Sequence, residues 1–222
     1  MFAIRSHRLG LERSRSAGMS LVETAIVLGV MGIVLAAIWL SVGPVQEKIR
    51  QARAAQEITT VVTNIRALYQ GQAMISGTFN GLRPGGLTNS LIYNGAIPND
   101  MIRDRSASPV VVDHPWGASG AAPNGSFVVS DNNNGDALST TDGQSFRIRL
   151  DGLPNASCIA MAMKITPQSG PTGLTGVVIN ADHLFGSSSL PWPITVTAAK
   201  IACNSPVNAN HVDYIFRLRQ QN

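Results

Sequence analysis

Charge is scarce in this chain, and it is unevenly distributed. Only 14% of the 222 residues are charged, and none of the residues from Thr24 to Gln46 is. The formal net charge is +4, but four of the 17 basic residues and one of the 13 acidic residues lie in residues 1–18, which leaves 13 basic and 12 acidic residues after them. A nucleic-acid-binding surface needs clustered basic residues. The nearly neutral remainder therefore argues against contact with nucleic acid.

The chain also lacks the short motifs that mark common enzymes. It contains no G-x-S-x-G turn, no H-E-x-x-H helix and no glycine-rich phosphate loop. The one grouping that resembles a catalytic triad is Asp113, His114 and Ser119, and with Pro115 beside the histidine it is typical of a turn. We therefore expect no enzymatic activity and no cofactor.

Metal ligands are sparse as well. The four histidines show no ligand spacing, and the only two cysteines, Cys158 and Cys203, lie too far apart for a zinc knuckle. Residues 131–136 have the oxygen density of a calcium loop, but glycine occupies the position of the fifth ligand and no glutamate follows at the twelfth. A hairpin turn between two strands is the better interpretation of this stretch, and we expect no metal site.

In place of charge, the sequence has one long apolar run near its start. Residues 25–42 are almost all apolar, and with Leu21 and Val22 they approach the ~20 residues that cross a bilayer. A secretory signal would have a shorter apolar region ending in a small residue at the cleavage site, whereas here Gly18 precedes the run. Cleavage after Gly18 would remove the basic leader and leave the membrane span attached.

Glu23 is the one charged residue within this membrane-length segment. An ionised carboxylate near the hydrocarbon costs ~2.5–3.5 kcal/mol, so it needs a partner, and no nearby residue of the segment supplies one. Cleavage after Gly18 would give Met19 a free α-amine, against which a neighbouring subunit could place its own Glu23. The alternative is a carboxylate solvated at the headgroup level. We favour pairing between subunits, because the basic leader, the glycine and the glutamate occur together.

The stretch Gly18-Met19-Ser20-Leu21-Val22-Glu23, with the apolar run after it, resembles the class III signal of type IV pilins and pseudopilins. This resemblance implies that a prepilin peptidase cleaves between Gly18 and Met19 and methylates Met19, and that Glu23 becomes the fifth mature residue. Methionine at the first mature position and the length of the leader resemble the type IVb branch.

Weaker similarities extend over most of the chain. Three further stretches resemble the PilS-type major pilins of plasmid-encoded thin pili. They are His114-Pro115-Trp116-Gly117, Leu150-Asp151-Gly152-Leu153-Pro154 ahead of Cys158, and Cys203 shortly before a terminal strand.

Gly43 and Pro44 interrupt the helical pattern at the end of the apolar run. Proline removes one helical hydrogen bond and disfavours helix in the residue before it, which predicts a kink or a locally weak segment. Many pilins have a proline a few residues earlier, where this chain has Leu40. The kink therefore either serves the same purpose or only marks the exit from the membrane.

Four parts follow from these observations. They are a cleaved basic leader over residues 1–18, a transmembrane and assembly helix over residues 19–45, an amphipathic helix over residues 46–73, and a globular extracytoplasmic head over residues 74–222. The amphipathic helix has an apolar stripe that runs from Ile49 through Ile58 to Leu68 and Tyr69 and that needs a sheet to cover it.

The head is expected to combine short helices with an antiparallel sheet. Turn residues predominate from Thr78 to Asn124, and the elements predicted are helices over residues 87–93, 99–105 and 156–165 and strands over residues 126–130, 146–150 and 212–218. The last two strands alternate apolar with charged residues, which predicts half-buried strands. The fold class is therefore α+β, with a long N-terminal helix packed on an antiparallel sheet as in the pilin fold.

Cys158 and Cys203 are expected to form a disulfide. Both lie in the part of the chain predicted to be outside the cytoplasm, where disulfides form and persist. The loop between them spans 45 residues, and closing it would contribute ~4 kcal/mol in the chain-entropy model.

The resemblance implies a structural subunit of a type IVb pilus that serves adhesion or conjugative contact. The expected partners are other copies of the chain in a helical filament, prepilin peptidase, the inner-membrane assembly machinery, membrane lipid before assembly and a minor tip pilin. The head would lie in the periplasm before assembly and on an extracellular pilus afterwards. The alternatives are a minor pilin or a type II secretion pseudopilin, and then a membrane-anchored binding domain or enzyme that never polymerises.

Overall fold

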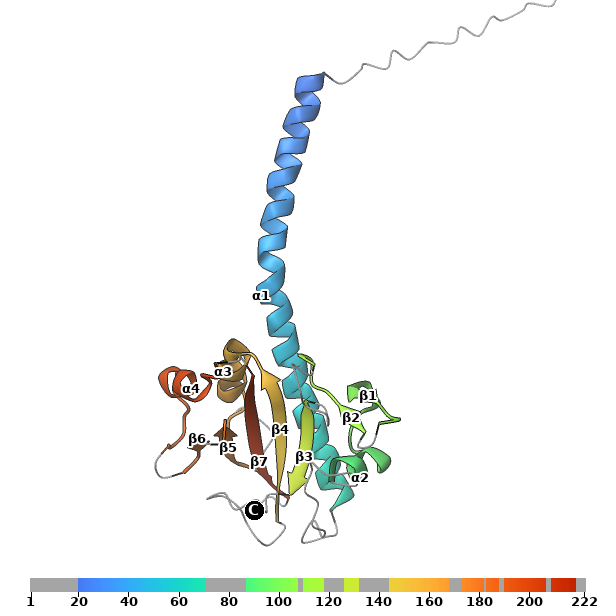
Figure 1. Ribbon diagram of the computed structural model, residues 1–222, viewed down its shortest axis with the longest axis vertical. Coiled ribbons are helices and arrows are strands. Elements are labelled where there is room, and N and C mark those ends of the chain that lie inside the picture. The colour runs from blue at the N-terminus through green and yellow to red at the C-terminus, as the bar shows by residue number, and fades with distance from the viewer. Residues whose placement is uncertain are drawn as a thin grey trace, which may run out of the picture. The chain divides into compact units, whose positions relative to one another are not determined.

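The computed structural model of the protein describes residues 20–70, 87–107, 110–117, 126–131, 144–167, 173–181, 183–187, 190–206 and 209–218. The chain divides into two compact units, Met1–Val45 and Gln46–Asn222. One helix, α1 (Leu21–Leu68), contributes its first half to the first unit and its second half to the second (Figure 1).

The second unit is built on a five-stranded antiparallel sheet in the order β3-β4-β7-β5-β6 (Figure 1). Its strands are β3 (Phe127–Asp131), β4 (Ser145–Leu153), β5 (Leu174–Ile179), β6 (His183–Phe185) and β7 (Asn210–Arg217). The α+β class predicted from the sequence is confirmed, and so is the antiparallel pairing of β3 with β4. Strand β7 comes from the end of the chain and yet lies in the middle of the sheet, because it pairs with both β4 and β5.

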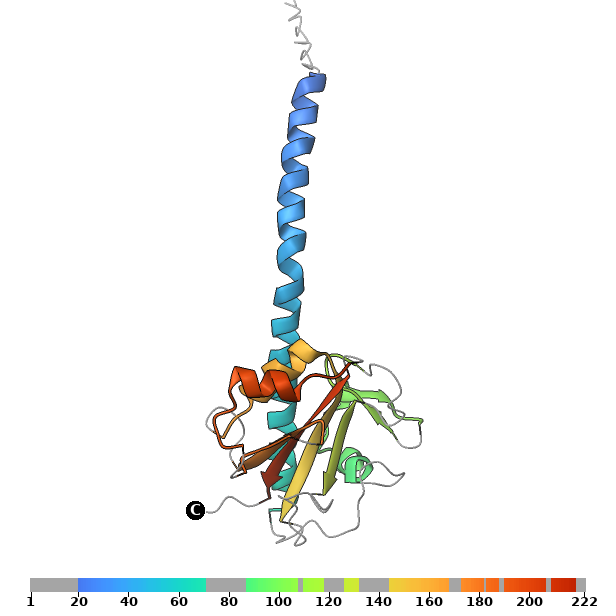
Figure 2. The same ribbon diagram turned by 60° about the vertical axis from the view of Figure 1, so that its left-hand side comes forward.

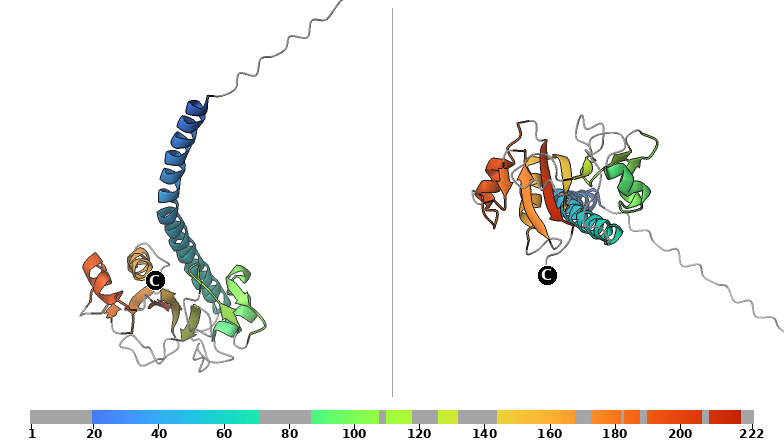
Figure 3. Two further views of the ribbon diagram at one scale, coloured as in Figure 1. Left: turned by 45° about the horizontal axis from the view of Figure 1, so that its top comes forward. Right: turned by 90° about the horizontal axis from the view of Figure 1, so that it is seen from below.

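One face of the sheet forms the core together with the second half of α1, which runs along the sheet (Figure 3). On this face Phe146 of β4 pairs with Phe216 of β7, and Ile148 pairs with Tyr214; all four side chains are fully buried. The helix contributes a stripe of buried residues at helical spacing: Ala54, Ile58, Val61, Val62 and Ile65. Burying one such valine or isoleucine stabilises the fold by about 1.5–3 kcal/mol.

The buried stripe of α1 is shorter than the sequence predicts. Ile49 is 60% exposed and Leu68 is 42% exposed, so neither belongs to the core. The difference arises because the fully buried apolar positions of α1 run only from Ala54 to Ile65, while Tyr69 beyond them packs against the core and is partly buried. Helical spacing identifies the side of a helix that is apolar, but not the length over which another element covers it.

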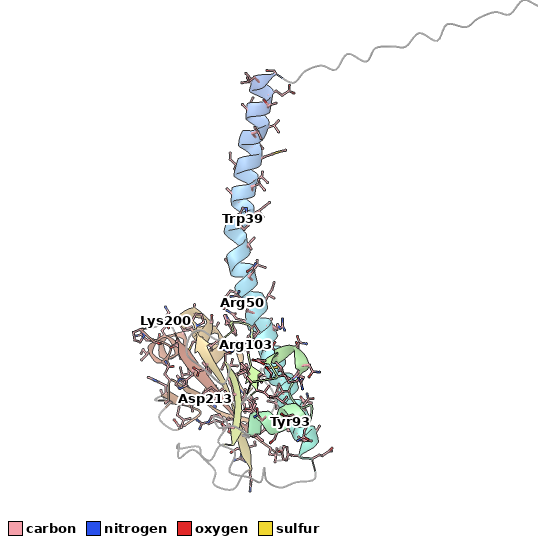
Figure 4. All side chains as sticks on the ribbon, turned by 45° about the vertical axis from the view of Figure 1, so that its right-hand side comes forward. Trp39, Arg50, Tyr93, Arg103, Lys200 and Asp213 are labelled. Carbon is pink, nitrogen blue, oxygen red and sulfur yellow. A yellow bond between two sulfur atoms is a disulfide. The ribbon has the colours of Figure 1, made fainter. Side chains whose placement is uncertain are left out.

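The opposite face of the sheet carries charge, and that charge is buried. Asp213 of β7 is fully buried and accepts hydrogen bonds from Arg149 of β4 (Nε to Oδ1, 2.7 Å; Nη2 to Oδ2, 2.9 Å) and from Arg147 (Nη1 to Oδ2, 3.2 Å; Figure 4). Arg147 itself is only 4% exposed. The prediction of half-buried strands is therefore wrong for β4 and β7, which are buried on both faces. In these three residues, which we call the Asp213 cluster, one fully buried carboxylate contacts two guanidinium groups, of which that of Arg149 is 25% exposed.

Three helices besides α1 are described: α2 (Leu87–Tyr93), α3 (Asn155–Lys164) and α4 (Val196–Ala202), the last two lying side by side near one end of the sheet (Figure 2). The helices expected over residues 87–93 and 156–165 are confirmed as α2 and α3. Helix α2 lies beside the edge strand β3, and the Thr88 hydroxyl accepts from the Val129 N–H and donates to the Val129 carbonyl, both at 2.9 Å. This side chain pairs backbone groups that an exposed edge would leave open.

The helix expected over residues 99–105 is wrong beyond its first turn. A 3-10 turn, η1 (Asn99–Met101), leads directly into strand β1 (Ile102–Asp104), which pairs with β2 (Val111–Val112). An ion pair between Arg103 Nη1 and Asp113 Oδ2 (2.8 Å) supports this small two-stranded sheet. Contacts with a segment about ten residues further along the chain outweigh the local helical preference.

His114 has a structural position just after β2. It is 3% exposed, its Nε2 lies 2.8 Å from the Asp151 carbonyl oxygen, and its Nδ1 accepts from the Trp116 N–H at 3.3 Å. This geometry assigns the neutral ring, with the proton on Nε2. The Gly117 N–H closes the turn on the His114 carbonyl at 2.8 Å. The turn expected here is confirmed, while Ser119 of the triad-like grouping lies outside the described residues.

Burial lowers the pKa of His114 below the ordinary value of 6.5. Below pH 6.5 the unfolded chain therefore binds more protons than the folded one, and the free energy of unfolding falls as the pH falls towards the folded pKa. We expect the His114→Gln protein to lose less stability than the natural protein between pH 7 and 5. This range is chosen because an ordinary histidine titrates at roughly pH 6.5. Denaturant unfolding of both proteins across this range measures the difference.

The comparison isolates His114, because the other titrating groups are common to both proteins. Burial also lowers the pKa of His211, whereas it raises the pKa of Glu57, and these two effects change stability in opposite directions as the pH falls. Parallel stability curves for the two proteins would mean that His114 does not titrate in the way its burial implies.

Candidate assembly site

The first described residue, Ser20, caps the N-terminus of α1. Its hydroxyl oxygen accepts from the Val22 N–H at 3.3 Å, and its carbonyl accepts from the Thr24 N–H at 3.1 Å. Such a cap pairs backbone donors that a helix start otherwise leaves unpaired. Gly18 and Met19, the residues expected at the processing site, lie outside the described residues.

Glu23 is the third residue of α1 and lies in its first turn. A carboxylate in this position is favoured by the positive end of the helix dipole. It is exposed, and among the residues that the structure describes it has neither a hydrogen bond nor an ion pair. The sequence reasoning missed that Ser20 and Glu23 have the spacing of a capping box, a signal that was available from the sequence. A helix start thus explains where Glu23 lies but gives it no partner.

The apolar side chains after Glu23 are left uncovered by the described part of the chain. From Leu21 to Trp39 the large apolar side chains are between 42% and 85% exposed. By length and composition, α1 is the one described helix that could span a membrane. An exposed apolar surface of this extent marks a region that contacts lipid or another protein.

Gly43 and Pro44 both lie within α1, which continues through them without a break in assignment. Proline has no N–H to donate to the carbonyl four residues earlier, so one hydrogen bond of the helix is missing here. The kink or weak segment expected at this place stays a prediction. An added Cβ at Gly43 would meet nothing within 4 Å, and the same is true at Gly29 and Gly32.

Glu47 connects the start of the head half of α1 to two other parts of the head. Its carboxylate accepts from the Trp116 indole N–H (3.0 Å to Oε1, 3.2 Å to Oε2), from the Ser157 hydroxyl of α3 (2.8 Å) and from Gln51 Nε2 (3.2 Å). In the sequence, Glu47 is one of the charged residues that stand between the apolar positions of the amphipathic helix. No local sequence pattern predicts that Trp116 and Ser157 bind the Glu47 carboxylate, because they lie 69 and 110 residues away in the chain.

Further along the helix, Arg53 and Glu57 form an ion pair that also reaches η1. Arg53 Nε lies 2.9 Å from Glu57 Oε1, and Arg53 Nη2 lies 3.2 Å from Asp100 Oδ2. Glu57 is only 8% exposed, and burial raises its pKa although the hydrogen bond from Arg53 acts in the opposite direction. Together with Glu47, this pair fixes the upper turns of the head half of α1 to the surrounding head.

Cys158 of α3 and Cys203, at the end of α4, form the expected disulfide. Both are buried, at 0% and 2% exposure, and the bond joins the two helices at one end of the sheet. The Asn210 side chain lies nearby in the fold and donates to the Leu153 carbonyl (3.1 Å) and to Asn155 Oδ1 (2.7 Å). These bonds attach the first turn of α3 to β7.

The calcium-like stretch over residues 131–136 is described only at Asp131, where β3 ends. The rest of it lies outside the described residues. In the part of the chain that the structure does describe, no three His, Cys, Asp or Glu side chains gather as metal ligands would.

Comparisons with known proteins show that the chain is similar to subunits of pili. No protein-family model matches the chain. The major structural subunit of the bundle-forming pilus of Escherichia coli O127:H6 is 22% identical over 216 residues, which cover 93% of this chain and 97% of that subunit. The corresponding subunit of Escherichia coli O111:H- is 22% identical over 212 residues, with the same coverage.

Two solved structures share the fold. The type IVb pilin of Salmonella typhi matches with a TM-score of 0.50 and 18% identity, over 72% of this chain and 95% of that one. TcpA, a type IV pilin from Vibrio cholerae El Tor, matches with a TM-score of 0.50 and 13% identity, over 75% of this chain and 98% of that one. At these identities the structures establish the fold alone. The long N-terminal helix, the antiparallel sheet and the sequence similarity along nearly the whole chain agree with one another: the chain has the fold of the type IV pilins and is similar in sequence to major structural subunits of a pilus.

Proposed function

We propose that the chain is the major structural subunit of a type IVb pilus and that it polymerises through the exposed half of α1. The observation that carries this proposal is the uncovered apolar helix, with a lone carboxylate near its start, attached to a folded head. Such a helix needs lipid before assembly and a second copy of itself afterwards. That the relatives are named major structural subunits favours this function over a minor pilin or a secretion pseudopilin.

The glycines of the span support close packing between subunits. Gly29 and Gly32 have open space where a Cβ would lie, so nothing in the described part of the chain requires glycine there. Small residues let the backbones of neighbouring helices approach closely in membranes and helical assemblies. In the proposed filament, these positions lie where α1 of one subunit meets α1 of another.

Processing and location follow from the same proposal. Prepilin peptidase cleaves between Gly18 and Met19 and methylates Met19, after which Glu23 is the fifth residue. Before assembly, the cleaved subunit is inserted in the inner membrane with its head in the periplasm. The assembly machinery extracts it into an extracellular filament that serves adhesion or conjugative contact, with a minor pilin at its tip.

The test is the composition of filaments sheared from the native host. We expect the dominant protein to be this chain, beginning at methylated Met19 and two protons lighter than the reduced form because of the Cys158–Cys203 bond. Recovery of the cleaved chain from membranes but not from filaments would favour a minor pilin or pseudopilin. An uncleaved chain beginning at Met1 would refute the processing step.

Glu23→Ala is expected to lower the amount of filament at least about tenfold while leaving cleavage and membrane insertion intact. In the proposed filament Glu23 pairs with the α-amine of Met19 in a neighbouring subunit, and a hydrogen bond between charged groups is worth about 1.5–3 kcal/mol. Because this contact repeats at every subunit, its loss weakens each step of growth. Quantitative immunoblotting of the sheared and membrane fractions measures the effect.

Two further variants control for other effects of this substitution. Glu23→Gln keeps the size of the side chain and removes its charge, so it should resemble Glu23→Ala if pairing with an amine is the cause. Asp104→Ala removes an exposed acid of the head that has no part in these contacts of α1 and should leave filament yield unchanged. Normal yields from both Glu23 variants would exclude the proposed contact as the determinant of subunit register.

A further inference from the structure

Two cations follow the apolar segment of α1 at a short distance. Lys48 and Arg50 are both exposed, and in the continuous helix they lie three and five residues after Val45. With a rise of 1.5 Å per residue, that is within about 8 Å of Val45 along the helix axis. If the apolar segment occupies the hydrocarbon, both cations lie at the depth of the lipid headgroups.

The acidic residue beside these cations is already engaged elsewhere. The Glu47 carboxylate faces the head, where it accepts from Trp116 and from Ser157. The next cation along the helix, Arg53, is paired with Glu57 and Asp100. Among the residues that the structure describes, Lys48 and Arg50 have no ion pair. The positive charge at this end of the span is therefore not compensated by the described part of the chain.

The apolar neighbours of these cations suit a membrane interface. Ile49, between them, is 60% exposed although the sequence pattern assigns it to the core, and Trp39 is 76% exposed near the end of the span (Figure 4). Tryptophan is typical of the interface between hydrocarbon and headgroups. Lysine and arginine lie along apolar surface with their stems and keep their charged ends at the phosphates. This combination is what a helix leaving a bilayer presents to lipid.

We propose that Lys48 and Arg50 bind the headgroups of anionic phospholipids in the leaflet next to the head, and so fix the depth of the subunit before assembly. The inference rests on the proposed membrane-inserted stage and adds a lipid preference to it. Each basic residue near an anionic surface strengthens binding about fivefold. Together the two should give a preference of about tenfold or more for an anionic over a zwitterionic lipid at low salt.

Quenching of Trp39 fluorescence by brominated lipids tests this preference. The membrane-extracted full chain is placed in vesicles of phosphatidylcholine and phosphatidylglycerol, with the bromine on the acyl chains of one lipid or of the other. Trp39 lies in the span, whereas Trp116 donates to Glu47 beside Lys48, and Trp192 is the third tryptophan. A Trp39→Phe protein, measured alongside, gives the signal of Trp116 and Trp192, which is subtracted. We expect stronger quenching by brominated phosphatidylglycerol, a preference that declines as salt screens the charges.

The double variant Lys48→Gln, Arg50→Gln should reduce the preference to near one. Glutamine keeps the helical propensity of both positions, so α1 should be retained. The control is Lys200→Gln, which removes an exposed lysine from α4 and should leave the preference unchanged. Any basic leader that remains uncleaved contributes equally to all three proteins, so the comparison is unaffected by it.

The other outcomes overturn the inference in distinguishable ways. Equal quenching by the two brominated lipids in the natural protein would refute the lipid preference. A double variant that keeps the preference but assembles fewer filaments would assign Lys48 and Arg50 to a neighbouring subunit instead. Absence of quenching by either lipid would contradict the membrane-inserted stage itself, and with it the proposed function.

Discussion

Replacing Asp213 with alanine is expected to lower the free energy of unfolding of the head by about 3–5 kcal/mol. The carboxylate is fully buried and holds Arg149 through two hydrogen bonds of 2.7 and 2.9 Å and Arg147 through one of 3.2 Å. Its removal takes away the carboxylate that both guanidinium groups of β4 contact. Breaking a buried ion pair by removing one partner is among the most destabilising single changes that a fold can carry.

Denaturant unfolding of the full chain in detergent, followed by tryptophan fluorescence, measures this loss. Asp104→Ala is the matched control, because Asp104 is an exposed aspartate whose carboxylate accepts hydrogen bonds from Ser106 and Ala107, two and three residues further along the chain. We expect a change of no more than about 1 kcal/mol for that variant, in keeping with the small effects of most surface substitutions.

The triple variant Arg147→Met, Arg149→Met, Asp213→Leu distinguishes the ion cluster from simple packing. Replacing a whole buried cluster with apolar residues of similar size is often neutral or stabilising, whereas breaking it is not. We therefore expect the triple variant to be more stable than Asp213→Ala. If the triple variant were as unstable as the single one, the loss would come from the packing of these strands and not from unpaired charge.

Removing the disulfide is expected to lower the stability of the head by about 4 kcal/mol in the chain-entropy model. The bond between Cys158 and Cys203 closes a 45-residue loop, and both sulfur atoms are buried. The double variant Cys158→Ala, Cys203→Ala avoids a free thiol and leaves only a small change of volume. Its unfolding midpoint, compared with that of the oxidised natural protein, measures the effect.

The reduced natural protein is the matched control for this variant. Because the entropic effect acts on the unfolded chain, the reduced protein and the double alanine variant should be destabilised by similar amounts. If the double variant were much less stable than the reduced protein, the cavity left by the two sulfur atoms would be the larger cause. If both kept the stability of the oxidised form, the bond would make no net contribution to the folded head.

Several features of this protein could be predicted from the sequence because their signals are local. The apolar run after Glu23 predicts a long helix from its length and composition, and α2 and α3 follow from turn residues around short apolar segments. Alternation of apolar residues predicts β4 and β7 and identifies the side of each strand that faces the core. The disulfide follows from the presence of only two cysteines, both in a region predicted to be extracytoplasmic. In each case, the physical cause lies within about ten residues or in the composition.

Other features depend on contacts between distant parts of the chain, which local patterns do not contain. Strands β5 and β6 and helix α4 were not predicted, and residues 102–104 form a strand because they pair with β2. The alternating charges of β4 and β7 suggest a solvated face, yet Asp213 is buried because its two arginines come from the neighbouring strand.

In the candidate assembly site, too, some features could be predicted from the sequence and others depend on the tertiary structure. The sequence by itself determined a lone carboxylate at Glu23 and an apolar helix and predicts a processing signal before them, since these depend on the order of residues alone. Only the tertiary structure decided that Glu47 faces the head while Lys48 and Arg50 do not find a partner among the described residues. The physical reason is that the charge left at the surface of a helix depends on which neighbours the fold brings to it, and Trp116 and Ser157 reach Glu47 only after the sheet has formed.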